Sequence, residues 1–157
     1  MYNTFTAIDF EITYRKRWSI CQIGLVHYVN GIIQRKLSLL IQPQKNFYRN
    51  HFISLEGISD GHQLAAPTFD KVWHQIELFT KDQHVLASFL FPFNFLFIES
   101  ELAYYGISKS PYFQHCIYLI YNKNLAMLCK EHNIIVNYYD AVSIALACGE
   151  LYLISSR

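Results

Sequence analysis

The stretch AIDFE, residues 7–11, places two acidic side chains at the end of a short apolar run that begins at Thr4. The run Thr4–Phe10 has strand character, so Asp9 and Glu11 stand where a first, buried strand gives way to a loop. Two acidic residues at such a position are usually only the exposed start of a loop. This stretch therefore decides the fold only in company with the patterns that follow it.

The next thirty residues predict two further strands joined by a tight turn. Ser19–Val29 is rich in Ile, Val, Leu and Tyr, and Asn30-Gly31 is a strong hairpin signal because both turn positions need a positive φ. Residues 33–42 then alternate between mostly apolar and mostly polar side chains, which is typical of a strand with one buried face. Three antiparallel strands are therefore expected in the first third of the chain.

The rest of the chain predicts helices and buried strands in alternation. Phe69, Val72, Trp73 and Ile76 have helical spacing. The expected elements are, in order, a loop with a short helical turn over 43–67, a helix over 69–79 with Thr68 as N-cap, a doubly buried strand over 85–91, a helix from Pro92 to Tyr105 closed by Gly106, a short strand near Cys116, a helix over 125–132 and a helix from the N-cap Asp140 to about Tyr152.

Composition sets limits on the class of protein. The chain has 157 residues, of which 52% are hydrophobic and 16% charged, so we expect one folded domain over 1–157 and exclude disorder. The net charge of +1 gives no global field of the kind that a strongly basic nucleic-acid binder carries. Four cysteines without CxxC spacing, and no secretory segment, predict reduced thiols in a cytoplasmic protein. The longest apolar run, 89–98, is too short for a membrane span.

Ordered pieces along nearly the whole chain, to about Leu153, carry a resemblance. The chain resembles the short bacterial DnaQ-like 3′–5′ exonucleases of the DEDDh type, relatives of the proofreading epsilon subunit of DNA polymerase III. The resemblance implies a ribonuclease H-like α/β fold, with a mixed sheet whose first three strands are antiparallel and which helices flank. The matching pieces are AIDFE (7–11), ISLEGI (53–58) followed by PTF (67–69) and Trp73, FN (93–94) through LAYYGI (102–107), and DA (140–141) through AC (147–148).

The family's chemistry uses two divalent ions, held by four acidic side chains, and a His that takes a proton from the attacking water. By resemblance, Asp9 and Glu11 are retained as ligands for Mg²⁺ or Mn²⁺. The second motif has Asn94 where the family has Asp, and the third has Tyr139 and Ile144 where the family has His and Asp. Three of the five functional positions have therefore changed, so whether the chain is an enzyme stays open.

Each change has a physical consequence for hydrolysis. Asn94 keeps an oxygen ligand without its charge, whereas Ile144 offers a metal ion nothing. Each lost pair of opposite unit charges is worth about 4 kcal/mol at ~4 Å in a protein-like dielectric. Tyr139, with an ordinary pKa near ~10, is a poor base at neutral pH. At most one weakly bound ion is expected, at Asp9 and Glu11.

Other acidic side chains are weak substitutes for the missing ligands. Asp140 stands beside Tyr139, but its expected N-cap role explains it without a metal ion. Glu99 and Glu101 lie one to two helical turns beyond Asn94 and are expected to be too far away.

Three functions are left open by the sequence. The first is an inactive or weakly active exonuclease domain that binds a single-stranded nucleic-acid 3′ end or a protein partner. The second is a residual metal-dependent 3′–5′ exonuclease on single-stranded DNA or RNA, with Asp9, Glu11, Asn94 and Asp140 around one ion. The third is a structural or assembly role as a homodimer formed through aromatic side chains.

Overall fold

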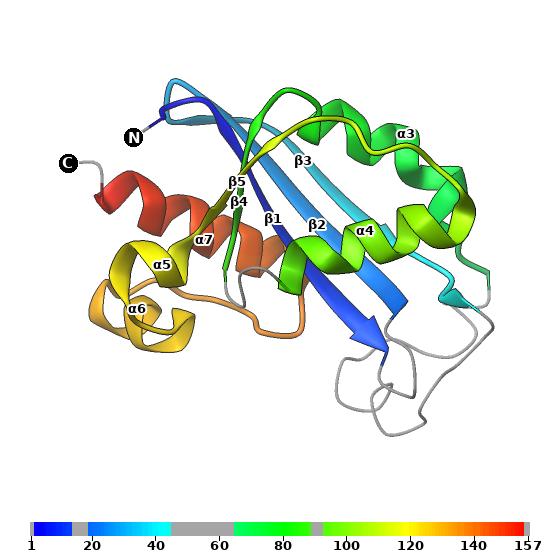
Figure 1. Cartoon of the computed structure of the whole chain (residues 1–157). Coiled ribbons are helices and arrows are strands. Elements are labelled where there is room, and N and C mark those ends of the chain that lie inside the picture. The colour runs from blue at the N-terminus through cyan, green and yellow to red at the C-terminus, as the bar shows by residue number, and fades with distance from the viewer. Residues whose placement is uncertain (1, 14–18, 45–64, 89–92, 156–157) are drawn as a thin grey trace.

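The computed structural model describes residues 2–13, 19–44, 65–88 and 93–155 and forms a five-stranded mixed sheet with helices on both faces (Figure 1). The strands lie in the order β3-β2-β1-β4-β5. The elements are β1 (Phe5–Thr13), β2 (Ser19–Val29), β3 (Ile32–Leu40), α3 (Phe69–Thr80), β4 (His84–Ala87), α4 (Phe93–Tyr105), β5 (Phe113–Cys116), α5 (Ile117–Tyr121), α6 (Leu125–Glu131) and α7 (Ala141–Ser155). None of the helices in these segments combines the length and the apolarity needed to cross a bilayer.

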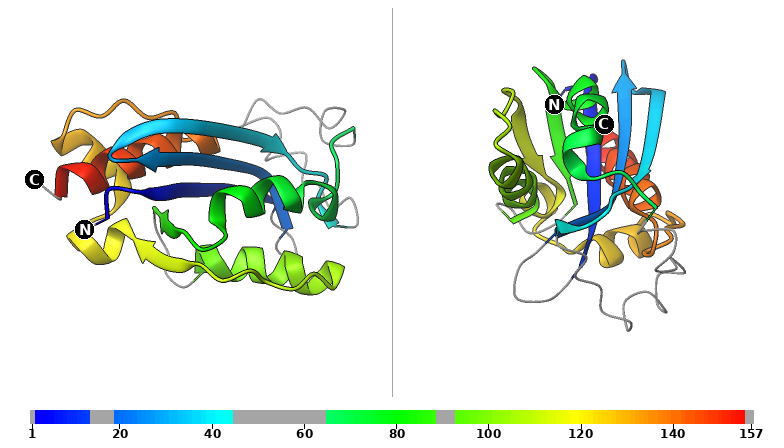
Figure 2. Two further views of the ribbon diagram at one scale, coloured as in Figure 1. Left: turned by 90° about the horizontal axis from the view of Figure 1, so that it is seen from above. Right: turned by 90° about the vertical axis from the view of Figure 1, so that its right-hand side faces the viewer.

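The first three strands are antiparallel, as the sequence predicts, and β1 then pairs with β4, and β4 with β5, in parallel. The β2–β3 hairpin turns at Asn30 and Gly31, whose φ angles of 53° and 76° are both positive. Strand β2 is buried along nearly its whole length because helices cover both of its faces, as the two views of Figure 2 show. The ribonuclease H-like mixed sheet with three antiparallel strands first is confirmed.

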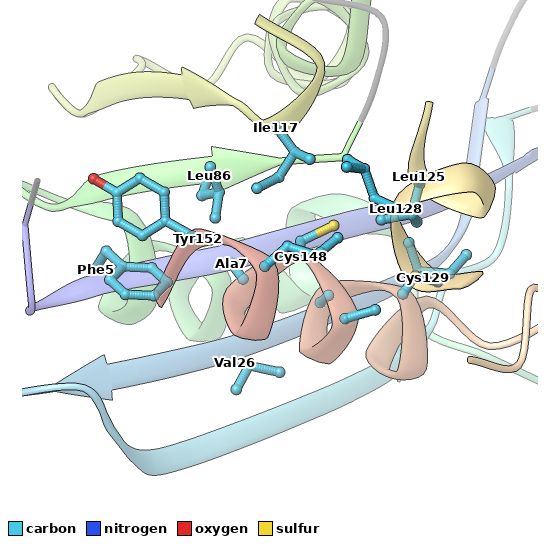
Figure 3. Packing of buried hydrophobic residues seen from close by; sticks show 14 of the residues in the cluster. Phe5, Ala7, Val26, Leu86, Ile117, Leu125, Leu128, Cys129, Cys148 and Tyr152 are labelled. Atoms are coloured by element: carbon cyan, nitrogen blue, oxygen red, sulfur yellow. The ribbon is translucent and has the colours of Figure 1, made fainter. Parts of the chain in front are cut away.

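Two hydrophobic clusters lie on opposite faces of the sheet. One packs α5, α6 and α7 against Phe5 and Ala7 of β1, and part of it is drawn in Figure 3. The other packs α3 and α4 against Ile8, and Phe10 contacts its edge. Because successive strand residues point to opposite faces, Asp9 and Glu11 continue the row of Phe5 and Ala7 on the α7 face.

Helix α7 lies unusually close to the sheet because two glycines give it room. A Cβ atom on Gly24 of β2 would meet backbone atoms of Ala141 and Val142 at 2.2–2.4 Å. At the other end of the contact, a Cβ atom on Gly149 would meet the ring and hydroxyl of Tyr28 at 2.4–2.5 Å. The first turn of α7 is thereby fixed over Gly24, which is paired with Asp9 in the β1–β2 register.

The structure corrects four expectations about elements. Strand β4 ends at Ala87 and not at Phe91, and residues 89–92 lie outside the described parts. The helix α5 was not expected, since its apolar run is only five residues long. Strand β3 is an edge strand that exposes Ile32 and Ile33, and only Leu37, Leu39 and Leu40 in its second half are partly buried. Thr68 holds the N-cap position of α3, but its hydroxyl bonds to Asp70 and caps no backbone N–H.

Candidate functional site

Asp9 is a buried carboxylate, 7% exposed, on the α7 face of the central strand. Its Oδ1 accepts a hydrogen bond from the Ser88 hydroxyl at 3.0 Å, and a second bond comes from the backbone of Phe10. Burial raises the pKa of Asp9 to about 7 in spite of these two bonds. No salt bridge between described residues reaches it. A carboxylate desolvated in this way would gain stability from a cation beside it.

Ser88 and Cys148 complete the surroundings of Asp9 from two other elements. Ser88 directly follows β4, and Ala87 before it pairs with Ile8, so Ser88 lies beside Asp9 at the same end of two parallel strands. Cys148 of α7 is wholly buried, and in Figure 3 it lies between α7 and β1 near Ala7. Burial, and next the Asp9 carboxylate, raise the pKa of the Cys148 thiol, which is also hydrogen-bonded to Ser88.

Glu11 lies two residues further along β1, partly exposed, and pairs with Gln22 of β2. The Gln22 side chain is occupied, because its Oε1 accepts a hydrogen bond from the backbone N–H of Ala141 at 3.2 Å. This bond caps the first turn of α7 and holds it next to the two acidic residues. The β1–β2 register shifts directly after Glu11, between Glu11 and Ile12. The site therefore lies where the regular sheet ends and α7 begins.

Ile144 lies in the apolar cluster that packs α7 against β1 and is 8% exposed. It precedes Cys148 by four residues, so the two side chains share one face of α7. The charge of Asp9 raises the pKa of the Cys148 thiol, so the two side chains lie near each other. Ala141, at the start of the helix, is fully buried. The described face of α7 next to Asp9 thus presents apolar groups and a thiol, and no carboxylate.

Tyr139 and Asp140 precede α7 in a turn and are both accounted for by local structure. Tyr139 is 54% exposed, and its backbone N–H donates to Oδ1 of Asn137. Asp140 caps α7 as predicted, with its Oδ2 accepting from the N–H of Ser143 at 3.1 Å. The helix runs on to Ser155, three residues beyond the expected end. The bond to the Ser143 N–H accounts for the Asp140 carboxylate without a metal ion.

The remaining candidates lie on α4. Asn94 is in its first turn, but the Asn94 side chain lies outside the described part of the structure, so its expected role as a ligand stays a prediction. Glu101 is buried beneath the start of β2, where Ser19, Ile20 and Gln44 donate to it. Glu99 is paired with Lys109 at 2.5 Å. The partners of Glu99 and Glu101 are different residues from those that surround Asp9.

Sequence reasoning missed Ser88, Cys148 and Gln22 as members of this site. A serine directly after an apolar strand carries no motif, and a lone cysteine or glutamine in an apolar run carries none either. The signal that was present is topological, because parallel β1 and β4 end side by side, so the residue after β4 must lie near the end of β1.

Two acidic side chains, Asp9 and Glu11, are the candidate metal ligands at this place. Asp9 and Glu11 supply carboxylate oxygens, which Mg²⁺ and Mn²⁺ prefer. Within the described ranges, no group of three or more His, Cys, Asp or Glu side chains is arranged to hold a metal ion. Asp9 and Glu11 therefore offer a partial coordination shell that water or a bound phosphate oxygen would have to complete.

Comparison with solved structures places the fold. A 3′-exonuclease solved for 3′-end recognition of a histone mRNA stem-loop has a TM-score of 0.73 at 14% identity, covering 99% of this chain and 81% of its own. Exonuclease X with 5′ overhanging duplex DNA gives 0.65 at 14% identity, covering 97% and 92%. The zinc-bound E. coli ExoI–ssDNA complex gives 0.72 at 13% identity, covering 97% of this chain and 40% of its own.

At the level of sequence the chain stands apart, since no protein-family model and no curated protein sequence matches it. At 13–14% identity the likeness to the solved nucleases is one of architecture. The strand order, the three antiparallel strands at the start and the helices on both faces agree with it over almost the whole chain. The chain has the fold of the DnaQ-like 3′–5′ exonucleases.

Proposed function

We propose that this chain is a DnaQ-like 3′–5′ exonuclease domain with a degenerate active site, which binds a single-stranded nucleic-acid 3′ end and cleaves it slowly or not at all. Asp9 and Glu11 would hold one Mg²⁺ or Mn²⁺, and that ion would contact the terminal phosphate. The ion supplies positive charge for binding, while the chain supplies the two carboxylates and the surrounding walls.

The observation that carries this proposal is the apolar packing of Ile144. Ile144 stands on the face of α7 that covers β1, in one cluster with Ala7 of the same strand row as Asp9. An aliphatic side chain at this place removes a metal ligand and fills the space with hydrocarbon. The site then has two acidic side chains on β1 and none on the described face of α7.

Charge balance explains why such a site would bind more readily than it hydrolyses. Two divalent ions carry four positive charges, and Asp9 and Glu11 supply two negative ones. Each unpaired charge forgoes about 4 kcal/mol at ~4 Å in a protein-like dielectric. One ion, by contrast, is neutralised by the two carboxylates. Without a second ion and a positioned base, neither a metal ion nor a general base is left to activate the attacking water.

Nucleic acid is the partner that the structural neighbours favour. The three neighbours compared above were solved for histone mRNA stem-loop recognition, with overhanging duplex DNA and with ssDNA. A protein partner and a homodimer stay hypotheses from the sequence, since no described contact supports either. The aromatic side chains are divided between the core and scattered exposed positions such as Tyr104 and Phe113.

The test measures binding and cleavage on the same oligonucleotides. A 3′-labelled single strand of DNA, and one of RNA, is titrated with the protein at low salt in Mg²⁺, in Mn²⁺ or in EDTA. Anisotropy reports binding, and gel electrophoresis reports loss of the 3′ end. Asp9→Asn and Glu11→Gln are the site variants, and Ser110→Ala serves as a variant remote from Asp9.

We expect metal-dependent binding that both site variants weaken, with cleavage no faster than in Asp9→Asn. Oligonucleotide blocked by a 3′ phosphate tests whether the terminal group is recognised. Failure of the parent protein to bind either strand under any of the three conditions would overturn the proposal. Binding that survives in EDTA and in Asp9→Asn would show that the site around Asp9 is not used.

Residual metal-dependent exonuclease activity is the second candidate, and the buried carboxylate of Asp9 favours it. Burial raises the pKa of Asp9 to about 7, and no cationic partner is found among the described residues. A bound metal ion would stabilise the ionised carboxylate. Mn²⁺-dependent loss of the 3′ label that Asp9→Asn abolishes would establish this function in place of the first. Loss of label that Asp9→Asn leaves unchanged would identify a contaminating nuclease.

A further inference from the structure

The hydrogen bond between Ser88 and Asp9 joins two strands at the candidate site. The Ser88 hydroxyl donates to Oδ1 of Asp9 at 3.0 Å, and both side chains are buried. Ser88 is the first residue after β4, next to the parallel strand β1, so its backbone position is fixed by the sheet. A hydroxyl carried on a fixed backbone and shielded from water is a strong constraint on the carboxylate that it touches.

Cys148 of α7 lies beside the same serine. The thiol is wholly buried and hydrogen-bonded to Ser88. Ser88 therefore contacts one side chain of β1, Asp9, and one of α7, Cys148. These contacts enclose the serine between the strand and the helix.

We propose that Ser88 is a positioning residue for Asp9, which turns Oδ1 into the hydrogen-bonded interior and leaves the second carboxylate oxygen for one metal ion. Cys148 supports Ser88 from α7. This inference rests on the cation site at Asp9 and Glu11 proposed above. It adds that Asp9 contacts this ion through the oxygen that Ser88 does not bond.

Mn²⁺ binding measures this role without any requirement for nuclease activity. The number of bound ions and their dissociation constant come from the electron paramagnetic resonance signal of free Mn²⁺ in titrations of the full chain. We compare the parent protein with Asp9→Asn, Ser88→Ala and Ser88→Thr. Ser110→Ala is a matched control, because Ser110 likewise donates to a carboxylate, that of Glu77, away from the site.

We expect one Mn²⁺ per chain in the parent protein and none in Asp9→Asn. Ser88→Ala should weaken binding on the order of 10-fold, which is the scale of lost support for a metal ligand. Ser88→Thr retains the hydroxyl and should restore affinity to near the parent value, and Ser110→Ala should leave it unchanged. A merely structural role of Ser88 would lower the unfolding midpoint in EDTA without changing the Mn²⁺ affinity of the folded protein.

Failure of this inference is distinguishable from failure of the proposed function. Parent-like affinity in Ser88→Ala, with binding abolished in Asp9→Asn, would overturn the positioning role and leave the cation site standing. No Mn²⁺ binding, or equal binding in Asp9→Asn, would overturn both the positioning role and the cation site. Oligonucleotide binding in EDTA would then decide separately whether the fold still holds nucleic acid.

Discussion

Asp9 and Glu101 are two buried carboxylates on opposite sides of one sheet, and their partners differ. Glu101, 2% exposed, accepts hydrogen bonds from the Ser19 hydroxyl, the Ile20 N–H and the Gln44 amide at 2.7–2.9 Å. Within the described parts of the chain, Asp9 has one side-chain donor, Ser88, and one backbone donor from its own strand. Glu101 ties α4 to the start of β2 and to the chain after β3. Among the described residues, Asp9 joins only its own strand β1 to Ser88, the residue after β4.

The two carboxyl groups differ in how far hydrogen bonds offset the cost of burying them. A buried carboxyl group is tolerated when hydrogen bonds replace its hydration, as three do for Glu101. Asp9 lacks enough of them, and the cost is visible as a pKa raised to about 7. Burial without full compensation lowers stability, and the cation proposed above would offset that cost at Asp9.

The largest effect is expected from adding a third carboxylate beside Asp9 with Ile144→Asp. Loss of a buried aliphatic side chain together with burial of a second acid should cost about 4 kcal/mol of unfolding free energy in EDTA. Mn²⁺ should return much of it, because the new acid completes the coordination shell. Urea unfolding followed by circular dichroism, with and without Mn²⁺, measures both. Ile144→Asn is the uncharged control, and equal recovery by Mn²⁺ in the two variants would contradict a metal site here.

Removing the charge of Glu101 should come next in size. In Glu101→Gln three charge-assisted hydrogen bonds become neutral ones, each weaker by roughly 1 kcal/mol, for a loss of about 3 kcal/mol. The loss should be the same in EDTA and in Mn²⁺, as measured by urea unfolding at neutral pH. A loss that Mn²⁺ enlarges would place a cation at Glu101 and break the contrast with Asp9.

Much of the fold was predictable because its signals are local. Helical spacing located α3 from Phe69 to Ile76, and the Asn30-Gly31 turn set the β2–β3 hairpin. The errors lie where tertiary packing decides. Strand β4 stops at Ala87 within an apolar run that continues to Phe91, and no local signal marks that end. Helix α5 is too short to show a period, since its five residues make little more than one turn.

The site was predictable only as far as the motifs reached. The AIDFE stretch identified Asp9 and Glu11, and the α7 start identified Asp140 as a cap. Ser88 and Cys148 come from elements 79 and 139 residues beyond Asp9 in the chain, and only the parallel β1–β4 pair and the close approach of α7 bring them together. The raised pKa of Asp9 follows from that burial, so it has no signature in the sequence.

Asp9→Asn should act in the opposite direction to Glu101→Gln and stabilise the metal-free protein. The folded pKa of about 7 exceeds the unfolded value of 3.8, so the folded state binds the extra proton between these pH values. Stability is therefore lost as pH rises from the unfolded pKa of 3.8 to the folded pKa of about 7, and the asparagine removes that loss. We expect a gain of about 2 kcal/mol at pH 8, against a ceiling of about 4 kcal/mol for a shift of this size.

The pH profile of that gain is its own control. Urea unfolding in EDTA should give the smallest gap in stability between the parent protein and Asp9→Asn near pH 4, close to the unfolded pKa of 3.8, and a gap that widens up to pH 7 and then changes little up to pH 8. Mn²⁺ at pH 8 should raise the stability of the parent protein toward that of Asp9→Asn, because the ion binds the folded parent protein. A gap that is independent of pH would mean that Asp9 is already compensated, as Glu101 is.

The smallest effect separates the hydroxyl donors of the two regions. Ser19→Ala removes one donor from Glu101 and the acceptor for the Gln44 N–H, so it should cost about 1 kcal/mol whether or not Mn²⁺ is present. Ser88→Ala removes the donor from Asp9, and its cost should change when Mn²⁺ is added, because the carboxylate then has a second partner. Parallel urea titrations of the two variants measure this. Identical Mn²⁺ responses would mean that Ser88, like Ser19, only satisfies a buried acid, and would overturn its positioning role for a cation at Asp9.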